Sequence, residues 1–208
     1  MSFSELWQYE QQAVENGHTL VCGCDEAGAG PLAGPVYAAA VILPFGVEIP
    51  GLNDSKKLTE KKREALFPII QEMAIAWAVA RIEAEEIDRT DILSARMKAM
   101  QMAIDALEKK ADFALIDGNR DKGRSAAITT PHTCVIKGDS LSASIAAASI
   151  LAKVSRDRWM MEAAKKYPQY CFEKHKGYGT KLHYQMLDQY GPCAVHRLTF
   201  LKKWEAKR

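Results

Sequence analysis

Apolar residues fall in short blocks along the chain, and polar or glycine-containing turns separate these blocks. Alternating or continuous apolar runs predict β-strands over residues 18–24, 36–43, 74–82, 113–116 and 133–136. Apolar residues at helical spacing predict helices over residues 4–17, 59–67 and 91–109, from Ser142 or Ser144 to 166, and over 181–190. Strands come first and then alternate with helices, which indicates an α/β fold with a mixed sheet flanked by helices.

Several residues set the expected ends of these elements. Thr59 and Asp91 each precede a helix and carry the side-chain oxygen of an N-cap. Pro68 is expected to kink or restart the helix that follows Thr59, and Gly191 is a natural C-cap for the last predicted helix. A loop rich in glycine and proline separates the first two strands, which we expect to pair as a hairpin.

The chain has 208 residues, 48% of them hydrophobic and 26% charged, a globular composition that excludes a wholly disordered chain. This length predicts one domain with a small C-terminal appendage. The first residues lack the apolar core of a secretory signal, and the longest apolar stretches are too short to span a bilayer. Five cysteines without framework spacing favour reduced thiols. We therefore expect a cytoplasmic protein that does not enter a membrane.

The formal net charge of +2 does not by itself indicate a nucleic-acid-binding protein, but the basic residues are clustered. Lysines and arginines concentrate in residues 56–63, 174–176 and 197–208. Separate basic patches on a nearly neutral chain suggest a positive face and a negative site elsewhere. The alternative is that these lysines simply decorate a soluble surface.

Acidic residues follow three of the predicted strands: the pair Asp25 and Glu26, then Asp117, and Asp139. Four carboxylates at one rim of a sheet would repel each other unless cations neutralise them. Oxygen ligands without cysteine or histidine select hard ions, so Mg²⁺ or Mn²⁺ is expected. Two such ions can activate water and stabilise the leaving oxygen of a phosphodiester. The alternative is that the acids only terminate strands and cap helices.

Six ordered motifs resemble bacterial ribonuclease HII, a type 2 ribonuclease H family. They are DEAGAGPLAGPV at 25–36, LNDSKKL at 52–58, IDGN at 116–119, KGD at 137–139, AAASILAKVSRD at 146–157 and HKGY at 175–178. The resemblance covers about residues 18–200. It implies a ribonuclease H-like fold, one domain over 1–208 with a catalytic core at about 18–165 and a helical C-terminal part at about 166–208. Only 24 residues precede Asp25, which favours this family over the related ribonuclease HIII with its extra N-terminal domain.

The resemblance also implies an activity. A monomeric endonuclease is expected to cut the RNA strand of RNA/DNA hybrids, and to cut 5′ to single ribonucleotides in duplex DNA, leaving 3′-hydroxyl and 5′-phosphate ends. Carried over to this chain, the residues that hold two Mn²⁺ or Mg²⁺ ions are Asp25, Glu26, Asp117 and Asp139.

One position departs from the family pattern. The family has Gly-Arg-Gly in the loop that senses the ribose 2′-hydroxyl, and here the residues are Gly28, Ala29 and Gly30. Alanine keeps the backbone N–H but removes a cation that could hold a phosphate, at a cost on the order of 1.5–3 kcal/mol. We expect weaker activity or binding. The alternative is a protein that binds hybrid duplexes without cutting them.

Five further residues are substrate-binding candidates by resemblance, each with a simpler alternative. Tyr178 would pack on a nucleotide sugar, or be a structural tyrosine. Lys56 would contact a phosphate, or be a solvated lysine. Asn119 would orient Asp117 or a phosphate, or form an ordinary turn. Ser142 and Ser144 would donate to phosphates at a helix N-terminus, or act as N-caps.

Two residue pairs are expected to be structural. Cys22 and Cys24 lie on one face of a strand without further cysteine or histidine partners, so they are expected to be buried core thiols rather than metal ligands. Lys153 and Asp157 are four residues apart on a helix and are expected to form an ion pair.

Overall fold

A five-stranded mixed sheet forms the centre of the protein in the computed structural model, which describes residues 6–206. The strand order is β3-β2-β1-β4-β5, and the strands are β1 (Val21–Ala27), β2 (Val36–Ile42), β3 (Ala76–Ile82), β4 (Phe113–Asp117) and β5 (His132–Val135). β1 pairs antiparallel with β2, and β2 with β3, whereas β1, β4 and β5 are parallel. The predicted hairpin and the mixed α/β sheet are therefore confirmed.

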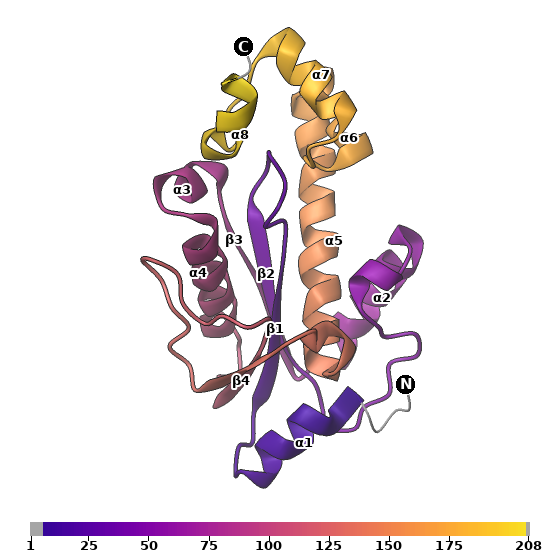
Figure 1. The fold of residues 1–208 in the computed structure, drawn as a ribbon. Coiled ribbons are helices and arrows are strands. Elements are labelled where there is room, and N and C mark those ends of the chain that lie inside the picture. The colour runs from indigo at the N-terminus through magenta and orange to yellow at the C-terminus, as the bar shows by residue number, and fades with distance from the viewer. Residues whose placement is uncertain (1–5, 207–208) are drawn as a thin grey trace.

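Helices cover both faces of this sheet, as Figure 1 shows. One face carries α4 (Ile92–Asp105), with α3 (Ala84–Arg89) beside it, and the other carries α5 (Ala143–Lys166), with α2 (Glu60–Met73) packed against α5. Beyond the end of α5 lie α6 (Phe172–His175), α7 (Lys181–Tyr190) and α8 (Leu198–Glu205). The remaining helices are α1 (Gln8–Glu15) and the 3-10 turns η2 (Ser55–Lys57), η3 (Gly138–Ser140) and η4 (Pro168–Tyr170).

Strand β1 shows how the core divides between the two faces. Cys22 and Cys24 are fully buried in the cluster beneath α4, which confirms the expected core thiols, and burial raises the pKa of Cys22 to about 12. On the opposite face, a Cβ at Gly23 would lie 2.2 Å from the backbone of Ser144 and Ile145. Glycine at this position therefore lets the start of α5 contact the sheet directly.

The capping residues act as predicted. The side chains of Thr59 and Asp91 accept hydrogen bonds from the backbone N–H groups of Lys62 and Ser94, and Gly191 ends α7 with a φ of 69°. Lys153 Nζ and Asp157 Oδ1 form the expected ion pair at 2.6 Å.

Several predicted boundaries were wrong. Helix α2 continues through Pro68 to Met73, because buried Ile70 in the following turn packs in the same core as Leu66 and Phe67 and offsets the lost hydrogen bond. Strand β1 passes through Asp25 and Glu26 to Ala27, because these residues still pair with β2. Helix α4 ends at Asp105 rather than near 109, and α3, α6 and α8 were not predicted. Part of the expected helix at 4–17 lies outside the described residues.

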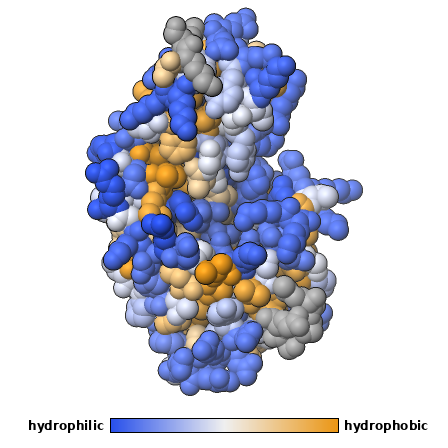
Figure 2. Space-filling model, in the orientation of Figure 1, coloured by the Kyte–Doolittle hydropathy of each residue, from blue (hydrophilic) through white to orange (hydrophobic). Residues whose placement is uncertain are grey.

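The face of the molecule seen in Figure 2 is largely hydrophilic. Figure 2 shows smaller apolar areas among polar side chains, and a notch between α2 and the C-terminal helices α6 and α7. Among residues 6–206, no helix is both long and apolar enough to cross a membrane.

Candidate active site

The four acids predicted from the sequence come to one edge of the sheet. In the parallel pair β1–β4, Cys24 is opposite Ile116, so Asp25 and Asp117 are the next residues of two neighbouring strands. Asp139 lies in η3, directly after β5. The N–H of Gly138 donates to Asp117 Oδ1 at 2.7 Å, which ties the turn that carries Asp139 to the end of β4.

Strand alternation and burial give these acids different surroundings. Asp25 is only 3% exposed and points to the α5 side, opposite to Cys24 and Glu26. Burial, reinforced by the neighbouring charges of Glu26 and Asp117, raises the pKa of Asp25 well above its usual range. Burial also raises the pKa of Glu26 and of Asp139. The protein therefore concentrates negative charge where it is poorly solvated.

Two cations oppose this cluster of charge. Lys56 Nζ, carried by η2, lies 3.1 Å from Asp139 Oδ2, and Arg96 Nη2, carried by α4, lies 2.6 Å from Glu26 Oε1. These contacts lower the pKa of Asp139 and Glu26, against the larger effect of burial. Lys56 therefore reaches the acids from its own 3-10 turn.

Arg96 was missed by the sequence reasoning. It interrupts the apolar side of the α4 segment between Leu93 and Met100, and this was the available signal. A cation in an otherwise buried stripe needs an anionic partner, and Glu26 on the adjacent strand supplies it. Arg96 Nε is buried without a hydrogen bond, so the guanidinium retains unused donor capacity.

The acid cluster fits a hard divalent cation by its chemistry. All four side chains offer oxygen, and Glu26 Oε2 is buried without a hydrogen-bond partner. Within residues 6–206, no three His, Cys, Asp or Glu side chains are arranged as ligands for one ion. Since Lys56 and Arg96 are paired with two of the acids, binding an ion here requires these side chains to rearrange.

The loop after β1 is anchored by a buried arginine. Arg197 is 0% exposed and donates to the carbonyl oxygens of Gly28, Ala29 and Gly34 at 2.7, 2.9 and 2.9 Å. In the described part of the chain, the backbone N–H groups of Ala29 and Gly30 have no hydrogen-bond acceptor. The loop therefore directs its carbonyls inward and leaves donors available to a ligand. The expectation that Arg197 belongs to an exposed basic tail was wrong.

A second buried arginine connects this loop to Tyr178. Arg156 donates to the carbonyl oxygens of Ala33 and Pro35 at 3.2 Å, and its guanidinium lies 5.8 Å from the centre of the Tyr178 ring. A Cβ at Gly28, where φ is +92°, would lie 2.0 Å from Arg156 Nε, so this position requires glycine. Tyr178 is 44% exposed beside the loop, in a position to contact a ligand there.

The remaining substrate-binding candidates have different surroundings. Ser142 and Ser144 are buried and donate to the Glu10 carboxylate at 2.5 and 2.6 Å, and Ser142 also caps α5. This favours the N-cap alternative for Ser142 and a structural role for Ser144, because neither hydroxyl is exposed to a phosphate. Asn119 is exposed and makes no hydrogen bond to Asp117, which Gly138 holds instead.

Solved structures share this architecture. The ribonuclease H2 from Pyrococcus horikoshii OT3 matches with a TM-score of 0.73 and 25% identity, over 91% of this chain and 98% of that chain. Bst-RNase HIII in complex with Mn²⁺ matches with a TM-score of 0.65 and 20% identity, over 94% of this chain and 72% of that chain. The fold and its acidic edge therefore place the protein in the class of ribonucleases H.

Comparison of sequences defines the family within that class. Ribonuclease HII from Endomicrobium trichonymphae is 52% identical over 198 residues, covering 95% of this chain and 93% of the relative. Ribonuclease HII from Dechloromonas aromatica is 56% identical over 181 residues, covering 87% and 90%. The family model for ribonuclease HII matches residues 22–203. The chain belongs to the ribonuclease HII family and is an endoribonuclease acting on RNA/DNA hybrids.

Proposed function

We propose that this protein hydrolyses phosphodiester bonds with two divalent ions held by Asp25, Glu26, Asp117 and Asp139. The observation that carries the proposal is the convergence of four carboxylates at one sheet edge, where burial already raises the pKa of three of them. Such charge concentration destabilises the ion-free protein, and divalent cations relieve it. Magnesium and manganese both suit this oxygen-only ligand set.

Each acid contributes differently to this site. Asp25 lies deepest, and Asp117 is held in place by the N–H of Gly138. Glu26 and Asp139 would give up their contacts with Arg96 and Lys56 to hold the ions. When bound, the ions supply Lewis-acid activation of the attacking water and charge stabilisation at the leaving oxygen. Lys56 would then be free of Asp139 and available to a substrate phosphate. Hydrolysis 5′ to a ribonucleotide in this way gives a 3′-hydroxyl and a 5′-phosphate.

We further propose that single ribonucleotides in duplex DNA are substrates. The free N–H groups of Ala29 and Gly30 would meet the ribose and its phosphate, and exposed Tyr178 would pack on a neighbouring sugar. The 2′-hydroxyl distinguishes RNA from DNA, so hydrogen-bonding groups fixed beside the acids can read it. The anchoring of this loop by Arg197 and Arg156 supports such a reading role.

Calorimetric titration of Mg²⁺ or Mn²⁺ tests the metal proposal. The parent protein with bound hybrid duplex should bind the ions, and the Asp117→Asn variant should bind them much more weakly. Lys109→Gln, at an exposed position beyond the far end of α4, is the matched control and should behave as the parent. Absence of ion binding by the parent in the presence of substrate would overturn the proposal and would favour the alternative of a non-cutting binder, for which the comparisons give no support.

A further inference from the structure

A cavity lies beside the acidic edge, between the start of α4 and the loop that follows β4. Its volume is about 550 Å³, and the residues that line it are Leu93, Asn119, Arg120, Asp121, Lys122, Gly123 and Arg124. The lining begins two residues after Asp117, so the cavity continues directly from the end of the strand that carries this acid.

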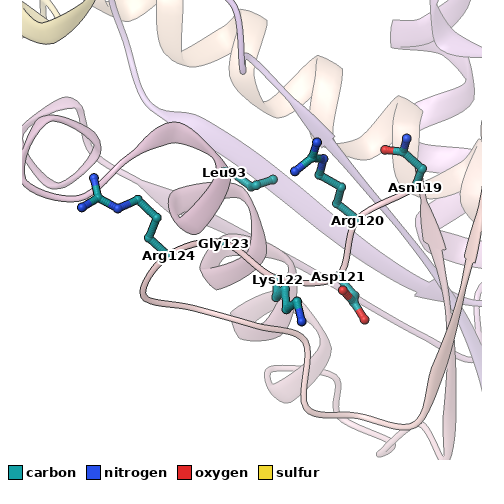
Figure 3. Close-up of a pocket in the computed structure, with 7 residues that line it drawn as sticks. All are labelled: Leu93, Asn119, Arg120, Asp121, Lys122, Gly123 and Arg124. Carbon is teal, nitrogen blue, oxygen red and sulfur yellow. The ribbon is translucent and has the colours of Figure 1, made fainter.

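The cavity is strongly cationic. Arg120, Lys122 and Arg124 are exposed, and none of them pairs with a carboxylate in the part of the chain that the structure describes. The only acid of the lining, Asp121, lies 3.4 Å from His132 Nε2. Figure 3 shows Arg120 and Arg124 extending from one side of the loop, and Lys122 and Asp121 from the other. Three cations against one carboxylate leave the lining with a net positive charge that attracts an anion.

Hydrogen bonds hold the backbone of the loop that carries these cations. The Gly123 N–H donates to Ala126 O, and the Ile128 N–H donates to Asp121 O, both at 2.7 Å. The Ser125 N–H donates to Ser94 Oγ at 3.0 Å, which fastens the loop to α4. A Cβ at Gly123 would lie 2.5 Å from the Ser94 backbone, so the contact is close. A rigid loop loses little conformational entropy when it binds a ligand.

A second, smaller cavity extends the cationic surface past Arg124. It has a volume of about 270 Å³ and is lined by Arg89, Thr90, Asp91, Arg124 and Ser125. Its acid, Asp91, is occupied as the N-cap of α4 through hydrogen bonds from Ser94. Several cations in a row suit a chain of phosphates better than one small anion.

We infer that this surface binds backbone phosphates of the substrate duplex on the α4 side of the active site, a proposal that rests on the proposed function. Lys56 reaches Asp139 from η2, which packs against α5, and Tyr178 lies against Arg156, which α5 carries. The loop cations would bind phosphates away from the cut, on the opposite side. They position the duplex, and they take no part in the chemical step.

The test compares the triple variant Arg120→Gln, Lys122→Gln and Arg124→Gln with the parent, both in the Asp117→Asn background so that substrate is not consumed. Binding to a ribonucleotide-containing duplex is measured by fluorescence anisotropy over a salt series. Each lost phosphate contact should lower the slope of log affinity against log salt by about 1 and weaken binding about 10-fold near 0.1 M salt. The matched control is Lys109→Gln with Lys110→Gln, two exposed cations beyond the opposite end of α4.

Duplex length gives the second measurement. Shortening the arm of the duplex that reaches the loop cations should abolish the difference between parent and triple variant. Shortening the opposite arm should preserve that difference. Equal affinities and salt slopes for parent and variant would overturn the inference. Failure of the proposed function would be distinct, because the protein with Asp117 intact would then cut no ribonucleotide-containing duplex, whatever the state of the loop.

Discussion

The buried carboxylate of Asp25 serves the active site but makes the folded protein less stable. Its carboxylate is buried beside Glu26 and Asp117, and its pKa lies well above the usual range. At neutral pH, an acid whose pKa is raised on folding makes the folded state less stable, and the penalty disappears as the pH falls below the pKa of the unfolded chain. Removing the charge should therefore stabilise the protein while removing a metal ligand.

The first prediction concerns Asp25→Asn. Near pH 7 we expect the free energy of unfolding of the ion-free variant to be about 1–2 kcal/mol higher than that of the parent, because one buried repulsive charge is lost. Mn²⁺ should raise the unfolding temperature of the parent and have little effect on the variant. Urea titrations with and without Mn²⁺ measure both effects. A variant less stable than the ion-free parent would contradict this reading of the cluster.

The second prediction concerns Ala29→Arg, which restores the family's arginine. Ala29 is half-buried at the rim of the anchored loop, and its carbonyl already accepts from Arg197. A new guanidinium here can hold a phosphate, so kcat/KM on a single-ribonucleotide duplex should rise about 10-fold or more. Ala29→Gln, of similar reach without charge, is the control. An equal gain for both variants would show that charge is not the cause.

At the scale of elements, the loop after β1 depends on an arginine from the far end of the chain. Arg197, at the N-terminus of α8, makes three hydrogen bonds to loop carbonyls. A buried carbonyl left without its donor costs about 1–3 kcal/mol. The C-terminal helices therefore support the loop that faces the substrate.

The third prediction follows from this support. Arg197→Gln should lower the free energy of unfolding by about 3 kcal/mol and reduce the preference for a ribonucleotide-containing duplex over all-DNA. Arg197→Lys retains the charge and should recover part of the stability but little of the preference, because one ammonium cannot reproduce the guanidinium geometry. Exposed Lys203→Gln on α8 is the control. An unchanged preference in a folded Arg197 variant would contradict the account.

The fourth prediction concerns the histidines that pack among the C-terminal helices. Burial lowers the pKa of His183 and of His196 to about 4, and their Nε2 atoms lie 3.0 Å apart. Between about pH 6.5 and 4, these histidines therefore bind protons in the unfolded chain but stay neutral in the folded chain. The free energy of unfolding falls as the pH falls through this window. The loss should reach about 2 kcal/mol near pH 5 for one bound proton.

Urea titrations near pH 7 and pH 5 measure this loss. They are best made in the Asp25→Asn background, because Asp25 has the opposite pH dependence. Stability that does not change over this range would contradict the assignment of neutral, buried histidines.

At the scale of the whole molecule, the sequence predicted more of the sheet than of the contacts around it. All five strands and the caps at Thr59 and Asp91 follow from local patterns, which a short window contains. Arg96 on Glu26 and Arg197 on the loop could not be predicted, because these partners are 70 and more than 160 residues apart in the chain. The contact of Glu10 with Ser142 and Ser144 could not be predicted for the same reason.

The acids lie at one edge of the sheet. The anchored loop and Tyr178 lie on one side of these acids, and the cations of the loop next to α4 lie on the other. We expect this arrangement to cut nucleic acid where it meets a ribonucleotide. The most direct measurement is the cleavage, with Mn²⁺ or Mg²⁺, of an end-labelled DNA duplex carrying one ribonucleotide, beside its all-DNA control. We expect a single metal-dependent cut 5′ to the ribonucleotide and none in the control. No cut at any enzyme concentration, or equal cutting of both duplexes, would contradict it.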